Sequence, residues 1–286
     1  MRFKLAALPL MLLAAAATAE EYNSITTVGY SNLDFDNIDG NQLSAETTYY
    51  FDGKESLGPL REFEYINKAS NISAAYLHYD VGSFDLDNFA VAGEYFAGNG
   101  LVFGANLTEV DDDNVNTVSL GYLFTPNFLL KLSHTDRDSD EETYIEARYN
   151  HQLSGSDYIG FDFAADDDFD VRIFTSKYFA SLGNDQYLTA DFAYASFDEG
   201  DDYWQIGADY YFTRNTAFGV TVDENEDYKV GFSHFFSRNV AVEAAYSTIL
   251  SNAAWDIRSF GHEAFAVAAN ADVEVDKFEL GLTVQL

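Results

Sequence analysis

The sequence contains no cysteine, only 3 prolines and far fewer basic than acidic residues. Without cysteine, neither a disulfide framework nor a thiolate metal site can form. The scarcity of proline leaves long stretches in which strand hydrogen bonds are not interrupted. The net charge is −33, and so acidic a chain lacks the basic surface that phosphate backbones require. We therefore predict no nucleic-acid partner.

The chain also lacks a run of ~20 apolar residues long enough for a membrane helix. Its one marked apolar run, residues 5–16, follows Arg2 and Lys4 and precedes Ala17-Thr18-Ala19. This pattern predicts a secretory signal peptide, residues 1–19, and leaves residues 20–286 as one domain. A short membrane anchor is the alternative, but the run is too short to span a bilayer. The exported chain is then either a soluble secreted protein or a membrane β-barrel, whose alternating strands helix hydropathy does not detect.

What is abundant is aromatic residues, 20 Tyr and 25 Phe, in an alternating pattern that argues against disorder. Residues 226–250 show the pattern: apolar side chains fall on one parity of 227–236, and the alternation resumes after Ser237-Arg238-Asn239. A period of two across a short connection predicts a β-hairpin. The same unit recurs and predicts sixteen strands: 22–31, 41–51, 70–79, 86–96, 100–109, 115–124, 127–135, 143–152, 158–165, 170–180, 186–197, 202–212, 215–222, 227–236, 239–249 and 276–286.

Every second connection between these strands is strongly acidic. Residues 34–39, 80–87, 109–113, 136–142, 166–170, 198–202 and 223–227 hold 27 carboxylates and one base, Arg137. The intervening turns hold two carboxylates, Asp157 and Asp185, and are flanked by Tyr and Phe. Alternate connections of a meander lie at opposite ends, and short turns beside an aromatic girdle are typical of outer-membrane barrels. We predict an all-β fold: a transmembrane antiparallel up-and-down β-barrel of about 16 strands, with short periplasmic turns and acidic extracellular loops.

The two faces of the predicted strands differ in charge. Leu101, Phe103 and Leu107 are typical of the apolar face. A Lys or Arg in mid-strand on a lipid face costs about 2–4 kcal/mol, so the charged face is expected to line a wet pore. A soluble barrel with an apolar core is the alternative. The predicted pore-lining residues are Glu94, Lys131, Glu146, Arg148, Asp162, Arg172, Asp191, Asp209, Lys229, Glu243 and Glu279.

Two segments interrupt the repeat. In residues 52–69, Pro59 is followed by apolar residues at helical spacing, which predicts a short helix on the periplasmic rim. Residues 251–275, with Trp255, Arg258 and His262, are taken as part of the last loop and as the candidate pore constriction. Residues 263–271 also alternate, so a further stretch of strand or a lumenal fold remains open.

Catalytic patterns are lacking in the sequence. No GxSxG, HExxH, P-loop or GxGxxG motif occurs, and there are five histidines. We predict no enzyme activity and no cofactor, although catalytic pairs assembled from distant strands leave a barrel enzyme open. The triplets 111–113 and 166–168 offer oxygen ligands to divalent cations, but without EF-hand spacing they favour a solvated rim over a metal site.

Residues 58–76, GPLREFEYINKASNISAAY, resemble a stretch of the small general porins of Gram-negative outer membranes. There, Gly-Pro-Leu leads an amphipathic segment and an Asn/Ser-rich entry into a strand. The resemblance implies an outer-membrane location and passive diffusion of small hydrophilic solutes. It also implies contacts with the bilayer, lipopolysaccharide and the outer-membrane assembly machinery, and a homotrimer. Two features depart from this resemblance. Porins usually end in Phe or Trp, whereas this chain ends in Leu286; larger porins fold a long third loop into the lumen, whereas the third loop here spans only residues 109–115.

The function predicted from the sequence is therefore a porin that prefers cations, since acids outnumber bases both in the loops and on the inward face. The alternative is an outer-membrane barrel whose acidic loops bind cations or a partner, with little transport.

Overall fold

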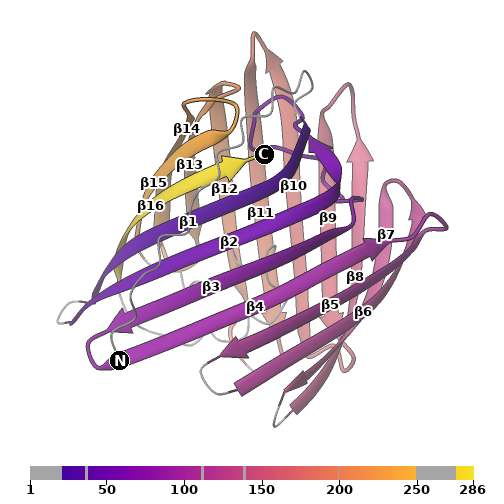
Figure 1. Cartoon of the computed structure of the whole chain (residues 1–286), viewed down its shortest axis with the longest axis horizontal. Coiled ribbons are helices and arrows are strands. Elements are labelled where there is room, and N and C mark those ends of the chain that lie inside the picture. Colours follow the sequence, from indigo (N-terminus) through magenta and orange to yellow (C-terminus); the bar gives the residue numbers. More distant parts are fainter. Residues whose placement is uncertain (1–20, 36–37, 111–112, 138–139, 199, 249–274) are drawn as a thin grey trace.

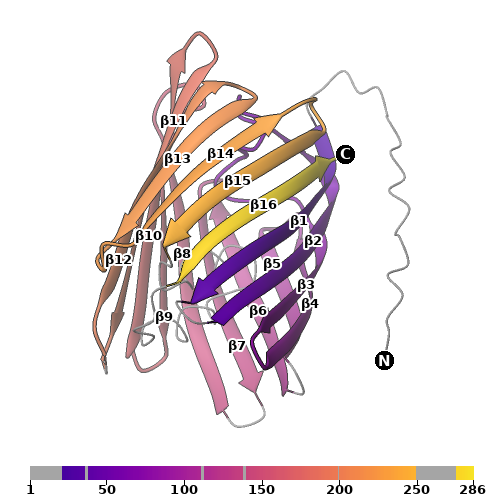
Figure 2. The same cartoon turned by 90° about the vertical axis from the view of Figure 1, so that its left-hand side faces the viewer.

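A computed structural model describes residues 21–35, 38–110, 113–137, 140–198, 200–248 and 275–286, which form a closed antiparallel barrel (Figures 1 and 2). Each strand pairs with its neighbours in sequence, and β1 pairs with β16 to close the sheet. The strands are β1 (Glu21–Phe35), β2 (Ile38–Glu55), β3 (Asn71–Val81), β4 (Phe84–Phe96), β5 (Leu101–Val110), β6 (Asp113–Thr125), β7 (Phe128–Arg137), β8 (Asp140–Gln152), β9 (Tyr158–Asp166), β10 (Val171–Gly183), β11 (Gln186–Phe197), β12 (Tyr203–Thr213), β13 (Thr216–Asp223), β14 (Tyr228–Phe235), β15 (Val240–Thr248) and β16 (Asp276–Gln285).

The predicted fold class and strand order are confirmed, with several strands longer than expected at their acidic ends. Asp34 pairs with Asp39 and Phe35 with Ile38, so the strand ladder extends into the first acidic connection. Carboxylates in a connection do not prevent backbone pairing, because the ladder uses only N–H and C=O groups.

The register keeps one apolar row on the outside of the barrel. Phe103 lies opposite Leu120, Leu120 opposite Leu132, and Leu132 opposite Ile145. All four side chains are exposed on the barrel surface. A period of two and a register that keeps these apolar residues opposite one another produce the apolar exterior that a lipid environment requires. Register shifts in four strand pairs lie near the non-acidic strand ends.

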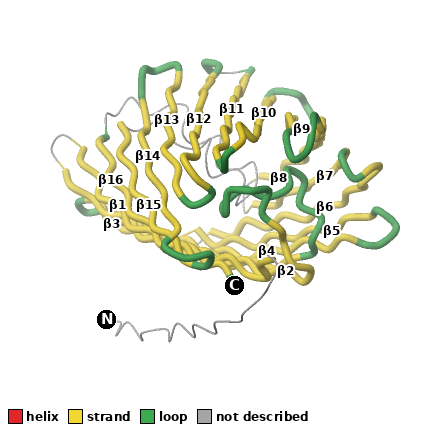
Figure 3. The backbone as a smooth tube through the Cα atoms, turned by 90° about the horizontal axis from the view of Figure 1, so that it is seen from above, coloured by secondary structure: helices red, strands yellow, loops and turns green. Residues whose placement is uncertain are grey.

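Both ends of the described chain meet at the non-acidic end of the barrel. The backbone N–H of Ser24 donates to the C=O of Leu286 at 2.8 Å. Viewed from above in Figure 3, the strands form a ring, and a loop lies inside it. With an even number of strands, the first and last strand ends necessarily lie on the same side.

The helix predicted within residues 52–69 is wrong. β2 continues to Glu55, residues 56–70 form an irregular connection, and no helix occurs in the part of the chain that the structure describes. Among those residues, no helix is long and apolar enough to cross a membrane. Gly58 has a φ of 144°, and a bridge joins Ser56 to Phe63. Contacts with the barrel wall outweigh the helical spacing here, since propensity is a weak determinant beside tertiary packing.

Three sequence predictions concern residues outside those described. They are the signal peptide at residues 1–19, the first two residues of the acidic triplet 111–113, and nearly all of the constriction assigned to residues 251–275. Trp255, Arg258 and His262 all lie in the last of these, before the description resumes at Val275.

Candidate functional site: the barrel lumen

The barrel interior holds a cavity with a volume of about 580 Å³. Charged, polar and apolar side chains from β2 to β12 line it, together with residues of the connection 56–70. Six of the eleven predicted pore-lining residues contribute to this wall: Glu94, Lys131, Glu146, Arg148, Asp162 and Asp191. Their strands alternate between this wall and the apolar exterior, so parity alone places them inside.

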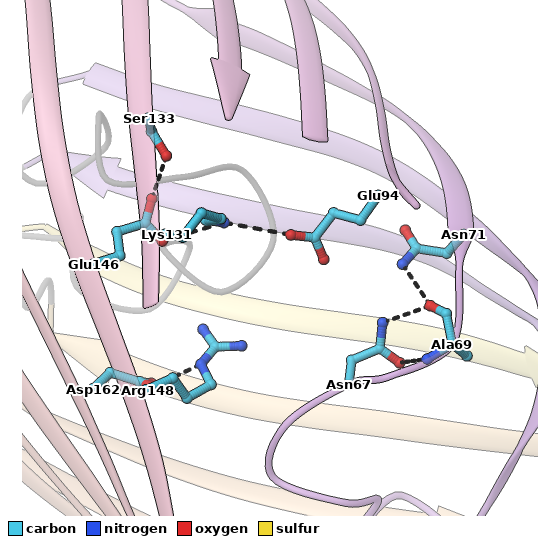
Figure 4. Close-up of polar contacts among 9 residues, drawn as sticks. All are labelled: Asn67, Ala69, Asn71, Glu94, Lys131, Ser133, Glu146, Arg148 and Asp162. Atoms are coloured by element: carbon cyan, nitrogen blue, oxygen red, sulfur yellow. Dashed lines mark hydrogen bonds and ion pairs between the residues drawn. The ribbon is translucent and has the colours of Figure 1, made fainter. Parts of the chain in front are cut away.

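The centre of the wall is an ion-pair network around Lys131 (Figure 4). The Lys131 Nζ lies 3.4 Å from a Glu94 carboxylate oxygen and 3.2 Å from one of Glu146. Ser133 Oγ donates to the other Glu146 oxygen at 2.5 Å. Lys131 and Glu146 lie directly opposite each other on β7 and β8, where opposite charges stabilise a strand pair by a few tenths of a kcal/mol to about 1 kcal/mol.

A second cross-strand pair lies one strand further on. Arg148 Nε donates to an Asp162 carboxylate oxygen at 2.7 Å, and the two residues are register partners on β8 and β9. Thr175 Oγ1 on β10 donates to the other Asp162 oxygen at 3.3 Å. The wall therefore presents alternating positive and negative groups, each held by neighbours, rather than a field of one sign.

Four further predicted residues also face inward but lie outside the lining of this cavity. Asp209 accepts a hydrogen bond from Thr189 Oγ1 at 3.2 Å. Lys229 Nζ lies 2.6 Å from Glu279, and Glu243 is 3.9 Å from Arg61 Nη1. The inner surface of β12 to β16 thus carries paired charges as well.

The prediction that Arg172 faces the lumen is wrong. Its neighbours Ile173 and Thr175 line the cavity, so alternation places Arg172 on the outer face. There its guanidinium donates to Ser196 Oγ at 3.1 Å and pairs with Asp198 at 3.5 Å. Arg172 is the second residue of β10 and lies at the acidic end, where a charged side chain reaches water instead of lipid.

Sequence reasoning missed the contribution of residues 56–70. Arg61, Glu62, Phe63, Glu64, Tyr65 and Asn67 all line the cavity. In Figure 1 this connection is the violet coil between β2 and β3, beside the far wall. This connection alternates charged residues with large apolar ones, which a segment exposed to water on the rim would not require. That composition was the signal from which contact with the barrel interior could have been predicted.

Glu62 anchors the connection to the opposite wall. Its side chain is 7% exposed, and one oxygen lies 2.7 Å from Lys177 Nζ of β10. Tyr211 on β12 donates its hydroxyl to the other oxygen at 2.6 Å. Burial alone would raise the pKa of Glu62, but the positive charge of Lys177 and the two hydrogen bonds hold it below its ordinary value. Glu62 is therefore ionised at neutral pH and joined to two strands.

Apolar contacts fix two points of the same connection, Leu60 and Ile66, to opposite sides of the barrel. Leu60 packs with Phe235 and Ala241, at the ends of β14 and β15. Ile66 packs with Val102 of β5 and Leu129 of β7. These strand groups are on opposite sides of the ring in the strand order. Residues 60–66 therefore cross the barrel interior near its non-acidic end.

The acidic rim is electrostatically crowded. Desolvation and the neighbouring carboxylates of Asp198 and Asp166 raise the pKa of Asp170 above its ordinary value. Asp166 itself accepts the backbone N–H of Val171 at 3.1 Å, so it caps its own loop. A cluster of carboxylates such as this attracts mobile cations to the acidic end of the barrel.

Comparison with known proteins agrees with this geometry. The model of the family described as "Putative general bacterial porin" matches residues 3–273. Among solved structures, the outer membrane protein Omp33 of Acinetobacter baumannii is similar, with a TM-score of 0.56 at 16% identity over 94% of this chain and 100% of that one. OpdQ of Pseudomonas aeruginosa gives 0.51 at 12% identity, over 93% and 98%. No curated protein sequence matches the chain. The structural likeness concerns the fold.

Proposed function

Because the chain belongs to the general bacterial porin family, we propose that it forms a water-filled channel for the passive diffusion of small hydrophilic solutes, with a preference for cations. An outer-membrane location follows from the family and the barrel fold, and both support the role of a channel. The observation that carries the proposal is a lumen lined by charged side chains and enclosed by an apolar exterior.

Cation preference is supported by two layers of charge. The acidic loops form the outer layer, and their effect extends over a Debye length of ~8 Å at physiological salt. In the inner layer, seven carboxylates and five basic groups line the cavity. They are Glu46, Glu62, Glu64, Glu94, Glu146, Asp162 and Asp191 against Lys54, Arg61, Lys131, Arg148 and Lys177. Rings of charged side chains set selectivity in pores, and the excess here is negative.

The test is the reversal potential of the purified protein in a planar bilayer under a KCl gradient. We expect K⁺ to be preferred over Cl⁻, more strongly at low salt, because the outer layer is screened as salt rises. Charge reversal at Asp209 or Glu243 should change the preference that persists at high salt. Anion preference of the native channel at low salt would contradict the proposal.

Liposome swelling separates this proposal from a barrel whose acidic loops bind cations or a partner with little transport. Proteoliposomes should swell in small neutral sugars at a rate above that of empty vesicles. Swelling no faster than in empty vesicles, with correctly folded protein, would favour the binding role.

A further inference from the structure

Two cavities lie on either side of the connection 56–70. The larger, of about 580 Å³, opens toward the middle of the barrel. The smaller, of about 420 Å³, is lined by the turns at the non-acidic end, including Pro126, Asn127 and Gly155. The connection therefore stands between the lumen and the exit at that end.

Three residues line both cavities: Glu64, Tyr65 and Tyr158. The rings of Tyr65 and Tyr158 pack with their centroids 5.6 Å apart and an interplanar angle of 50°. Glu64 is next to them and pairs with Lys68 at 2.8 Å. A solute that moves from one cavity to the other by this route passes Tyr65.

The barrel wall leaves space for the ring of Tyr65. Gly160 on β9 faces its ring, and a Cβ there would lie 2.3 Å from Tyr65 Cε2. An inward-facing glycine at this point makes room for the ring against the strand. The anchors at Glu62 and Ile66 hold the backbone on both sides of Tyr65.

We infer that residues 56–70 form a size-selective constriction of this channel within the described part of the chain, with Tyr65 as the residue that sets its width. The inference rests on the proposed channel function and goes beyond it, since it assigns the constriction to a connection at the non-acidic end. At the other end, the paired strands β5 and β6 extend to Val110 and Asp113, so the strand ladder takes up most of the third loop.

The test compares Tyr65→Ala with a matched control, Tyr122→Ala. Tyr122 is exposed on the outer face. Its substitution by Ala removes the same side chain without changing the lining of the pore. The readouts are single-channel conductance and liposome swelling in sugars from mono- to tetrasaccharide. We expect Tyr65→Ala to raise conductance roughly twofold and to admit larger sugars, because pore-lining groups at the narrowest point limit flow. Tyr122→Ala should behave as the native protein.

Folding is monitored by the heat-dependent gel migration of the intact barrel. Should Tyr65→Ala not fold, Tyr65→Cys gives a second measurement, because the chain has no other cysteine. A bulky hydrophilic thiol reagent should lower its conductance severalfold and leave Tyr122→Cys unaffected. Full labelling of Tyr65→Cys without a change in conductance, or a folded Tyr65→Ala with native conductance and size limit, would overturn the inference. A native protein that does not conduct would refute the channel itself, so the two failures are distinct.

Discussion

At the scale of single residues, Glu62 shows how a charge far from its partners in sequence holds the pore element. Its carboxylate is buried between Lys177 and Tyr211, which lie on different strands. Removing one member of a buried ion pair leaves the other unpaired, and the cost reaches about 3–5 kcal/mol in dry sites. Water in the lumen reduces this cost, but the two hydrogen bonds are lost in any case.

Glu62 also predicts a dependence of stability on pH. Its folded-state pKa is lower than the unfolded value of 4.5. The stabilisation is therefore fully present above that unfolded value and is lost as the pH falls through the lower folded-state pKa. Urea unfolding in detergent micelles should show this acid-side loss in the native protein and a weaker one in Glu62→Gln.

Glu64→Gln is the matched control for Glu62→Gln. Glu64 is on the same connection, but its side chain is 59% exposed and forms an ion pair with Lys68. Exposed pairs of this kind contribute about 0–1 kcal/mol. Equal destabilisation by both substitutions would show that Glu62 is not an anchor.

Gly160→Ala should destabilise the protein by about 1–3 kcal/mol, because the added methyl overpacks the seat of Tyr65. Gly231→Ala is the control: it is also a strand glycine, but its nearest contact would be Ala245 Cβ at an ordinary 3.8 Å. Chemical denaturation midpoints of the two variants provide the comparison. An unchanged stability of Gly160→Ala would mean that the Tyr65 ring can adopt another position without cost.

At the scale of the strand, neighbouring residues belong to different environments. On β6, Leu120 is exposed on the outer face, and Ser119 lines the cavity. The difference follows from the two-residue period and not from position along the barrel axis.

Leu120→Arg should therefore cost about 2–4 kcal/mol in a lipid bilayer, whereas Ser119→Arg should cost much less. Ser119→Arg should instead reduce cation preference, because it adds a positive charge to the lumen. Folding equilibria in lipid vesicles test the expected costs of the two substitutions. Reversal potentials test the reduced cation preference of Ser119→Arg. A larger folding cost for Ser119→Arg than for Leu120→Arg would contradict the face assignment.

At the scale of the whole molecule, the chain's acidic connections gather at one end of the barrel. Closure by β1 and β16 brings the first and last strands together at the other end. Aromatic-flanked turns are typical of the periplasmic side of outer-membrane barrels. We therefore predict that the acidic connections face the outside of the cell.

Single cysteines at Asp167 and Asp201, and at Asp112 outside the described residues, should react with an impermeant reagent on intact cells. Cysteines at Asn127, Asn215 and Asn239 should react only after the outer membrane is opened. The reverse pattern would invert the barrel in the membrane. The absence of native cysteine removes background labelling.

The sequence by itself determined the barrel, its strand order and the inward face of ten of the eleven proposed lining residues. These features depend on local rules, namely a period of two, short turns and charge excluded from lipid. Arg172 failed because, at a strand end, a charged outward residue meets water and the cost that excludes charge from the lipid face disappears.

Only the tertiary structure decided the course of residues 56–70. Their helical spacing was a local signal, whereas Leu60, Glu62 and Ile66 find partners on strands that are distant in sequence. No periodicity encodes such pairings, because they depend on which walls face each other once the barrel closes. Local sequence patterns thus determine the strands. The course of residues 56–70, which narrow the lumen, is determined by contacts that exist only in the closed barrel.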